Sequence, residues 1–292
     1  MTGHAVDLRR KIDNAKDLHS VVQTMKAMAA SSIGQFEQSV ESVGDYYRTV
    51  SLGLTACLRQ QNAMISPPAE RRDEQRPLIA VVFGSDQGLA GQFNENIADF
   101  TLEHLRGREA SLHLWAVGER VESRLTDAGL AISGRFDVPN AVKAIPPLVG
   151  RILMANENLL AQAEHADMQL FYNQPASGAV FEPVRQRLLP LDRFWIVSLI
   201  ETPWPTDNLP EVVGDSRVAL QALVREYLFV SLFRACAESL ASENASRLAA
   251  MQRADKNIEE LLERLNTSFH RQRQSGIDAE LFDLIASFEA LK

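Results

Sequence analysis

The sequence has few cysteines, the residues that form disulfides and bind structural metal ions. It holds only two cysteines among 292 residues, which is too few for a disulfide framework or a zinc site and fits a reduced, cytoplasmic setting. No uncharged apolar run approaches the roughly 18 to 20 residues that span a bilayer, and the N-terminus lacks the apolar core of a signal peptide. We therefore expect any membrane association to come through a partner.

Positive charge is also in short supply. The 30 lysines and arginines are outnumbered by 38 aspartates and glutamates, which gives a formal net charge of −8. Without a strong cationic field a protein displaces few counterions from phosphates. The charge balance therefore argues against nucleic acid as a main partner.

Proline is absent before Pro67 and after Pro210, and both of these stretches have the apolar spacing of helices. The N-terminal stretch follows a seven-residue repeat with two apolar positions. The first position holds Ile12, His19, Lys26, Ile33, Val40, Tyr47 and Leu54, and the second holds Ala15, Val22, Ala29, Phe36, Val43, Val50 and Cys57. Such a repeat predicts a coiled-coil helix from about Leu8 to Gln60, roughly 80 Å long.

Two residues of this repeat, His19 and Lys26, are polar where apolar side chains are expected. One interpretation is a partner helix that leaves room for both side chains to reach solvent. The other is that this end of the helix lies against several partners and needs charge there.

The middle of the chain has an α/β pattern between two proline-rich linkers, 66–77 and 201–211. Strands are predicted at 77–84, 111–118, 166–173 and 193–200, with helices at 94–106 and 147–163. Strands that alternate with helices favour a parallel sheet with right-handed crossovers.

After about Val212 the pattern is helical again. Apolar residues recur at threes and fours: Leu223, Phe229, Leu232, Leu240, Leu248, Met251, Ile258, Leu261 and Leu265. The predicted fold class is therefore α/β, with a long antiparallel coiled coil of N- and C-terminal helices and a Rossmann-like α/β domain inserted between them. The predicted domains are a coiled-coil helix at 1–65, the α/β domain with its linkers at 66–210, and a second coiled-coil helix at 211–292.

The segment FGSDQGLAGQFN is the natural place to look for phosphate binding, because a glycine-rich turn between a strand and a helix can offer backbone N–H groups. Its glycines, Gly84, Gly88 and Gly91, do not match the dinucleotide or phosphate-loop spacing, and Asp86 adds negative charge. The histidines lack metal-ligand spacing, and Glu259 and Glu260 fit a solvated helix face. We predict a structural turn here, and no catalytic, cofactor or metal site in the chain.

Three segments together carry a family resemblance. They are KDLHSVVQTMKAMAAS (16–31), SDQGLAGQFNENI (85–97), and EYLFVSLFRACAESLASENASRLAAMQRADKN (226–257) followed by FHRQRQSGIDAEL (269–281). In this order they resemble the γ subunit of F-type ATP synthases, and the third is the most specific. Gln87, Ala90 and Gln92 depart from the family's pattern in the second segment.

The resemblance implies a central rotary shaft that couples ion flow to ATP synthesis or hydrolysis. The active sites would lie on the beta subunits of a ring of three alpha and three beta subunits, with the epsilon subunit and the membrane c-ring as further partners. It also implies a peripheral position on the cytoplasmic face of the plasma membrane. By position, the residues that face partners would be Met25, Lys26, Glu243, Arg247, Arg273 and Gln274.

Some positions depart from the family pattern. Ser20, Gln23 and Ser32 stand where the family usually carries lysine, and Asp278 replaces a hydroxyl residue. Lost positive charge weakens contact with acidic partner surfaces. We interpret the chain as a divergent paralogue that serves a complex of its own.

Two other classes of function stay open from the sequence. One is a nucleotide-binding α/β enzyme dimerised by its helices, which the off-pattern glycines disfavour. The other is a coiled-coil scaffold without a motor role, which explains the heptads but not the C-terminal segment.

Overall fold

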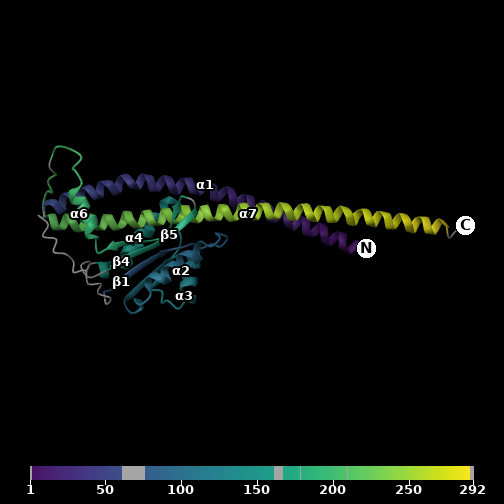
Figure 1. Ribbon diagram of the computed structural model, residues 1–292, viewed down its shortest axis with the longest axis horizontal. Helices are drawn as coiled ribbons and strands as arrows, with labels where there is room; N and C mark the ends of the chain where they lie inside the picture. Colours follow the sequence, from purple (N-terminus) through teal and green to yellow (C-terminus); the bar gives the residue numbers. More distant parts are fainter. Residues whose placement is uncertain (1, 61–75, 161–166, 178, 209, 290–292) are drawn as a thin grey trace. The chain divides into compact units, whose positions relative to one another are not determined.

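The computed structural model describes residues 2–60, 76–160, 167–177, 179–208 and 210–289. Two long helices, α1 (Thr2–Gln60) and α7 (Ser216–Glu289), flank a five-stranded sheet and its helices in the sequence (Figure 1). The strands are β1 (Leu78–Phe83), β2 (Leu112–Val117), β3 (Gly134–Phe136), β4 (Asp167–Ala176) and β5 (Ala179–Leu189). The shorter helices are α2 (Phe93–Leu105), α3 (Glu119–Asp127), α4 (Ile145–Ala155), α5 (Glu157–Leu160) and α6 (Arg193–Glu201).

Contacts divide the chain into two units, each of which contains part of both long helices. The helical unit is Met1–Ala30 with Arg247–Lys292, and the sheet unit is Ser31–Ser246. None of the described helices combines the length and the apolar content that a membrane span requires.

In each unit α1 and α7 run antiparallel, as predicted. In the sheet unit the Tyr46 hydroxyl donates to Glu226 Oε2 at 2.8 Å, and Gly53 lies against Leu223. In the helical unit His19 Nε2 lies 2.9 Å from Asp255 Oδ1, and Val22, which comes later in α1, packs against Met251, which comes earlier in α7. Rising numbers on one helix therefore meet falling numbers on the other.

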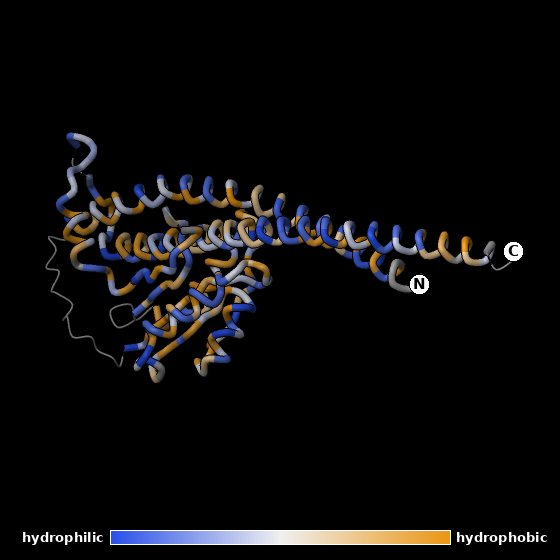
Figure 2. Tube along the Cα trace, turned by 45° about the vertical axis from the view of Figure 1, so that its right-hand side comes forward, coloured by the Kyte–Doolittle hydropathy of each residue, from blue (hydrophilic) through white to orange (hydrophobic). Residues whose placement is uncertain are grey.

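The heptad predicted for α1 is the side of the helix that packs. Every residue at its two apolar positions, from Ile12 to Cys57, is buried or half-buried, including His19 and Lys26. Along the Cα trace of both long helices, hydrophobic and hydrophilic residues alternate at short intervals, as an amphipathic helix requires (Figure 2). The predicted coiled coil is confirmed.

The sheet has strand order β3-β2-β1-β4-β5, and its first four strands are parallel. Because side chains alternate along a strand, the central strand β1 faces two layers. Leu78, Ala80 and Val82 pack with residues of α2 and α3. Ile79, Val81 and Phe83 belong to the cluster that also holds residues of α4 and the long helices.

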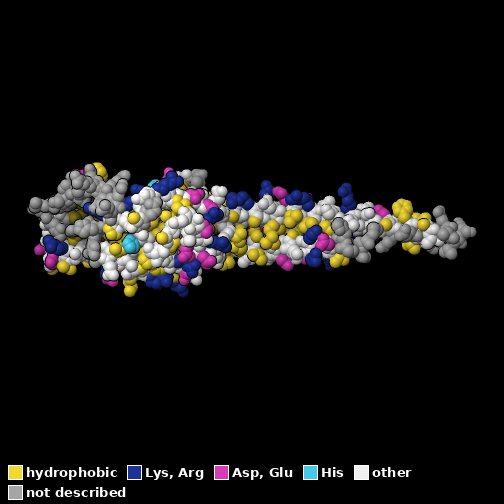
Figure 3. All heavy atoms as spheres, turned by 90° about the horizontal axis from the view of Figure 1, so that it is seen from below, with side chains coloured by type: hydrophobic (Ala, Val, Ile, Leu, Met, Phe, Trp, Pro, Cys, Tyr) yellow, Lys and Arg dark blue, Asp and Glu magenta, His cyan; other side chains and the backbone are white. Residues whose placement is uncertain are grey.

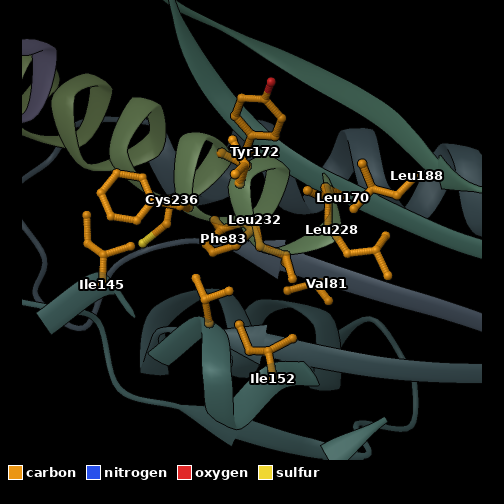
Figure 4. Close-up of a cluster of buried hydrophobic side chains, with 14 of the residues drawn as sticks. Val81, Phe83, Ile145, Ile152, Leu170, Tyr172, Leu188, Leu228, Leu232 and Cys236 are labelled. Atoms are coloured by element: carbon orange, nitrogen blue, oxygen red, sulfur yellow. The ribbon is translucent and has the colours of Figure 1, made fainter. Parts of the chain in front are cut away.

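The cluster that contains Ile79, Val81 and Phe83 joins the sheet to the coiled coil within the sheet unit. Figure 4 shows Val81 and Phe83 of β1 between Ile152 of α4 and Leu232 of α7. Burial of large aliphatic side chains of this kind contributes about 1.5–3 kcal/mol each relative to exposure. The inserted domain is therefore fastened to the long helices by apolar packing over a whole sheet face.

The sheet is mixed, which corrects the prediction of a purely parallel sheet. Strand β5 pairs antiparallel with β4 and forms one edge of the sheet. It contains Pro183 as well as Arg185 and Arg187, which hid it in the sequence. Proline and charged side chains are tolerated on an edge strand, where one side of the backbone needs no ladder partner.

Residues 193–200 form helix α6, so the strand predicted there is wrong. Asp192 caps this helix by accepting a hydrogen bond from the Phe194 amide at 2.8 Å. The inward side chains, Trp195, Ile196 and Leu199, have the spacing of a helix face, while Phe194 is 83% exposed. The Trp195 ring lies 4.9 Å from that of Tyr227 of α7, which fixes the helix against the coiled coil.

The other predicted elements are found close to where they were placed. Strands β1, β2 and β4 and helix α2 match their predicted ranges, and the helix predicted at 147–163 is α4 and α5 as far as it is described. Helix α3 and the short strand β3 were not predicted. Residues 161–163 and most of the first predicted linker, 66–75, lie outside the described residues.

Glycine is required at position 84, immediately after β1. A Cβ atom there would lie 2.4 Å from Cβ of Val121 in α3, which is closer than packed atoms come. We expect Gly84→Ala to lower the free energy of unfolding by about 1–3 kcal/mol through overpacking, measured by urea unfolding.

Gly44→Ala is the matched control, because Gly44 lies inside α1 with nothing within 4 Å of its added Cβ. Alanine in a helix interior is favoured over glycine by about 0.5–1 kcal/mol, so this variant should be slightly more stable than the parent. An equal loss in both variants would contradict the close approach of Gly84 to α3.

Candidate partner-binding surfaces

Met25 and Lys26 are neighbours in the part of α1 that belongs to the helical unit. Met25 is half-buried and packs against the small cluster of Val22, Met251 and Ile258. Part of its side chain therefore supports the helix pair, and the rest is open to solvent. Methionine is adaptable enough to serve both a seam and a partner surface.

Lys26 makes an ion pair across the helix pair. Its Nζ donates to Oδ2 of Asp255 at 2.9 Å, and His19 Nε2 lies 2.9 Å from the other carboxylate oxygen. Lys26 lowers the pKa of Asp255, and the nearby His19 adds to the shift against the opposing effect of burial. The two polar residues in the apolar repeat of α1 thus share one acidic residue of α7, which the sequence did not reveal.

Arg273 and Gln274 are exposed on the last part of α7, and so is Asp278. Large apolar side chains are also exposed there: Ile277, Leu281, Phe282, Leu284 and Ile285, with Phe282 at 71%. Figure 3 shows hydrophobic side chains at the surface toward the C-terminal end of the helix. Exposed apolar groups of this size mark surfaces that other proteins cover.

The outer side of α1 carries a second exposed apolar group that sequence reasoning missed. Leu18, Val21 and Met28 are each more than half exposed, and their spacing of three and seven residues puts them on one side of the helix. Ala15 and Leu18 also line an open apolar groove together with Leu261 and Leu265 of α7. The spacing was visible in the sequence, but the heptad was assigned to the neighbouring face.

Glu243 and Arg247 lie near the middle of α7, and they fall in different units. Glu243 is buried in the sheet unit, where its charge adds to the effect of burial in raising the pKa of Cys236. Arg247 is half-buried in the helical unit. Contacts of either residue with partner loops remain a prediction.

The SDQGLAGQ loop after β1 is held by its own side chains. Asp86 accepts hydrogen bonds from the Glu119 amide at 3.0 Å and from the Val138 amide at 2.8 Å. The first of these amides is at the N-terminus of α3, where an anion would otherwise bind. The carboxylate of Asp86 occupies that position, which agrees with the interpretation as a structural turn.

Polar contacts also fasten the inserted domain to both long helices. Ser246 Oγ of α7 donates to the Ala90 carbonyl at 2.5 Å, so α7 holds the same loop. Arg59, near the end of α1, donates to the carbonyls of Ile200 and Thr202 at 2.7 and 2.5 Å. A force on the sheet domain can therefore pass into α1 and α7 through backbone-directed hydrogen bonds as well as apolar packing.

One known protein family matches nearly the whole chain. The family whose model matches is described as ATP synthase, and the match runs over residues 4–291. The chain belongs to the ATP synthase family.

Similar proteins within the family carry the name ATP synthase gamma chain. The gamma chain of Syntrophus aciditrophicus is 27% identical, with 98% of this chain and 97% of that chain covered. The gamma chain of Anaeromyxobacter sp. is 28% identical, with 98% of each chain covered. The family resemblance is therefore confirmed over the whole chain.

Solved structures show the same fold. A chain of the Euglena gracilis mitochondrial ATP synthase (OSCP/F1/c-ring, rotational state 3) is similar with a TM-score of 0.63 at 17% identity, covering 100% of this chain and 95% of that one. A chain of the Tetrahymena thermophila mitochondrial ATP synthase (central stalk/c-ring) has a TM-score of 0.57 at 20% identity, covering 80% and 99%. The predicted fold class is confirmed.

The predicted role, a gamma-type central shaft in an F-type ATP synthase, is confirmed by family and fold together. The alternatives of a nucleotide-binding enzyme and a non-motor scaffold are not favoured. The six partner-facing residues and the division into domains at 1–65, 66–210 and 211–292 stay predictions.

The ion pair between Lys26 and Asp255 leads us to expect that the free energy of unfolding depends on pH. An aspartate whose pKa is lowered on folding stabilises the fold above its unfolded pKa of about 3.9, and this contribution is lost as the pH falls through the folded pKa. We expect Lys26→Met to unfold more easily than the parent near neutral pH, with a difference that shrinks below about pH 4. Urea unfolding followed by circular dichroism at several pH values measures it.

The control is Lys16→Met, at an exposed position of the same helix. Its free energy of unfolding should follow the pH profile of the parent throughout. A difference for Lys26→Met that stays constant from neutral pH to about pH 3 would contradict the ion pair as its cause.

Proposed function

We propose that this chain is a non-catalytic, rotating subunit whose ATP-handling active sites lie on partner beta subunits. The helix pair would stand inside a ring of three alpha and three beta subunits. The sheet domain would lie at its base, against an epsilon subunit and a c-ring. The exposed apolar group from Ile277 to Ile285 on α7 is the observation that supports a surrounding partner, because α1 and α7 bury their other apolar faces against each other.

A shaft without an active site can drive chemistry through differential contacts. A rotor angle that contacts one state of a catalytic subunit better than another shifts that subunit's equilibrium by the difference in contact free energy. The rotor must therefore present different groups in different directions. The exposed residues of the helical unit differ in this way, with Leu18, Val21 and Met28 on α1 and Arg273 and Gln274 on α7.

The inserted domain would serve as the point where torque enters. Its attachments to α1 and α7 include Arg59, Ser246 and the apolar cluster around Phe83. We infer that the domain boundaries at 1–65, 66–210 and 211–292 reflect this division between shaft and base. The complex would lie on the cytoplasmic face of the plasma membrane, with this chain held there by its partners.

Assembly tests this function. We expect one copy of the chain per three alpha and three beta subunits when it is co-expressed with alpha and beta subunits of the same source and purified through a tag on beta. ATPase activity of the purified complex should depend on its presence. A well-folded chain that joins no such ring would contradict the proposal.

A ring of alpha and beta subunits from another source, such as a housekeeping ATPase, is the comparison. The weakly basic α1 segment, with Ser20, Gln23 and Ser32, supports a ring dedicated to this chain. If the ring is dedicated to this chain, the chain should bind the ring from the other source with lower affinity, and that complex should have lower coupled ATPase activity. Equal coupled activity in both rings would show that the ring is not a dedicated one.

Arg273 and Gln274 are proposed to bind loops of the ring. Replacing both by alanine should lower the ATPase rate of the assembled complex at least about tenfold, because a lost charge-assisted hydrogen bond is worth about 1.5–3 kcal/mol and about 1.4 kcal/mol is a factor of ten. Melting of the isolated chain should not change, since both side chains are exposed.

Ser268→Ala is the control for this pair. Ser268 is also exposed on α7, and at about 100° per residue its side chain lies about 140° around the helix from that of Arg273 and about 120° from that of Gln274. Its ATPase rate should stay close to that of the parent. Equal losses of ATPase rate in the control and in the double variant would contradict a specific contact of Arg273 and Gln274 with the ring.

A further inference from the structure

A histidine and two carboxylates from both long helices converge on the surface of the helical unit. His19 comes from α1, and Asp255 and Glu259 come from one turn of α7. One ligand atom of each lies within 4.8 Å of the other two. His19 Nε2 lies 2.9 Å from Asp255 Oδ1 and 3.9 Å from Glu259 Oε1.

Asp255 is the fixed member of this group. Only 9% of the residue is exposed, and Oδ1, the oxygen that faces His19, has no hydrogen-bond donor with acceptable geometry among the described residues. A buried carboxylate oxygen without a well-aligned donor is costly, and the polar neighbour of Oδ1 is His19 Nε2 at 2.9 Å. A cation bound between these two atoms would serve both.

From these contacts we propose that His19, Asp255 and Glu259 bind a divalent transition metal ion, with zinc as the best fit. One imidazole nitrogen and two carboxylate oxygens are zinc ligands, and bond lengths of about 2.0–2.2 Å place tetrahedral ligand atoms about 3.3–3.6 Å apart. The distances from His19 Nε2 to Asp255 Oδ1, 2.9 Å, and to Glu259 Oε1, 3.9 Å, lie on either side of that range. A fourth position stays open to water.

The side chains can reach this geometry with small movements. Glu259 is 64% exposed, so its carboxylate is free to approach the other two ligands. The side-chain amide of Gln23 lies 3.3 Å from His19 Nε2 and can turn its carbonyl oxygen toward the same point. The charges also favour a cation, because two carboxylates outweigh the single ammonium of Lys26.

Lys26 fits the site as an outer partner. Its Nζ binds Asp255 Oδ2 at 2.9 Å and leaves Oδ1 directed at His19. Carboxylates that bind metals are themselves usually held by hydrogen bonds, which fix their orientation. Lys26 would therefore orient Asp255 without competing for the oxygen that binds the ion.

Bound metal would cross-link α1 to α7 within the helical unit, since the ligands come from both helices. An ion that binds the folded pair but not the separated helices stabilises the fold by mass action. Zinc would thus stiffen this part of the chain. This consequence does not depend on the rotary function.

The full-length chain, stripped with a chelator and dialysed at about pH 7.5, provides the test. We expect isothermal titration calorimetry with zinc chloride to show one site per chain that His19 controls. His19→Ala and Glu259→Gln should each weaken binding by at least about tenfold, because even outer partners of metal ligands are worth about 10- to 100-fold. Zinc should raise the melting temperature of the parent and not that of His19→Ala.

His270→Ala is the matched control, because His270 is an exposed histidine of α7 in the same unit. It should bind zinc like the parent. Glu259→Gln guards against misfolding as the explanation, since Glu259 is exposed and its replacement keeps the shape of the side chain. Zinc binding that is absent in the parent, or unchanged in both His19→Ala and Glu259→Gln, would overturn the proposal.

Discussion

The structure depends on the burial of one apolar stripe of α1 against one of α7. This pairing stabilises both helices, because most helical stability in proteins comes from packing of an amphipathic face. Each unit of the chain contains its own section of this pairing, with Phe36 and Leu54 in the sheet unit and Val22 in the helical unit. The order of the chain then requires the sheet domain to be inserted between two antiparallel helices.

The sheet domain depends on the pairing in turn. One face of β1 is covered by α2 and α3, which belong to the insertion itself, and the other face is covered by α4 and the long helices. The domain therefore cannot complete its second layer without the coiled coil. Such shared burial suits a part that passes force to the helices, because the joint is a packed core and not a flexible linker.

The helical unit is packed differently from the sheet unit. Its seam is thin, with small residues such as Ala15 and Ala29 and a polar group at His19, Lys26 and Asp255. Apolar side chains that a monomer would normally bury stay exposed on both helices, among them Met28 and Phe282. A section that is weakly packed inside and apolar outside is suited to a surrounding partner.

Periodicity made the long helices predictable, because a seven-residue repeat over fifty residues has no common alternative. Strands β1, β2 and β4 were predictable as short apolar runs bounded by polar residues or glycine, and β1 is buried along its whole length. Helix α6 was mistaken for a strand because its apolar run is equally short, and only its Asp192 cap and its packing on Tyr227 distinguish it. Edge strand β5 was missed because Pro183 and its charges are acceptable only at a sheet edge, which a linear sequence does not show.

The sequence by itself determined the helix pair, the inserted α/β domain and, through its motifs, the family. Tertiary structure alone decided which polar residues meet. Lys26 and Asp255 are 229 residues apart, and no local pattern connects them. The same holds for Asp86, whose carboxylate occupies the end of α3, and for His19 beside Asp255 and Glu259. Periodic burial is a local property that the sequence repeats many times, whereas each of these contacts occurs once and depends on the exact register of distant segments.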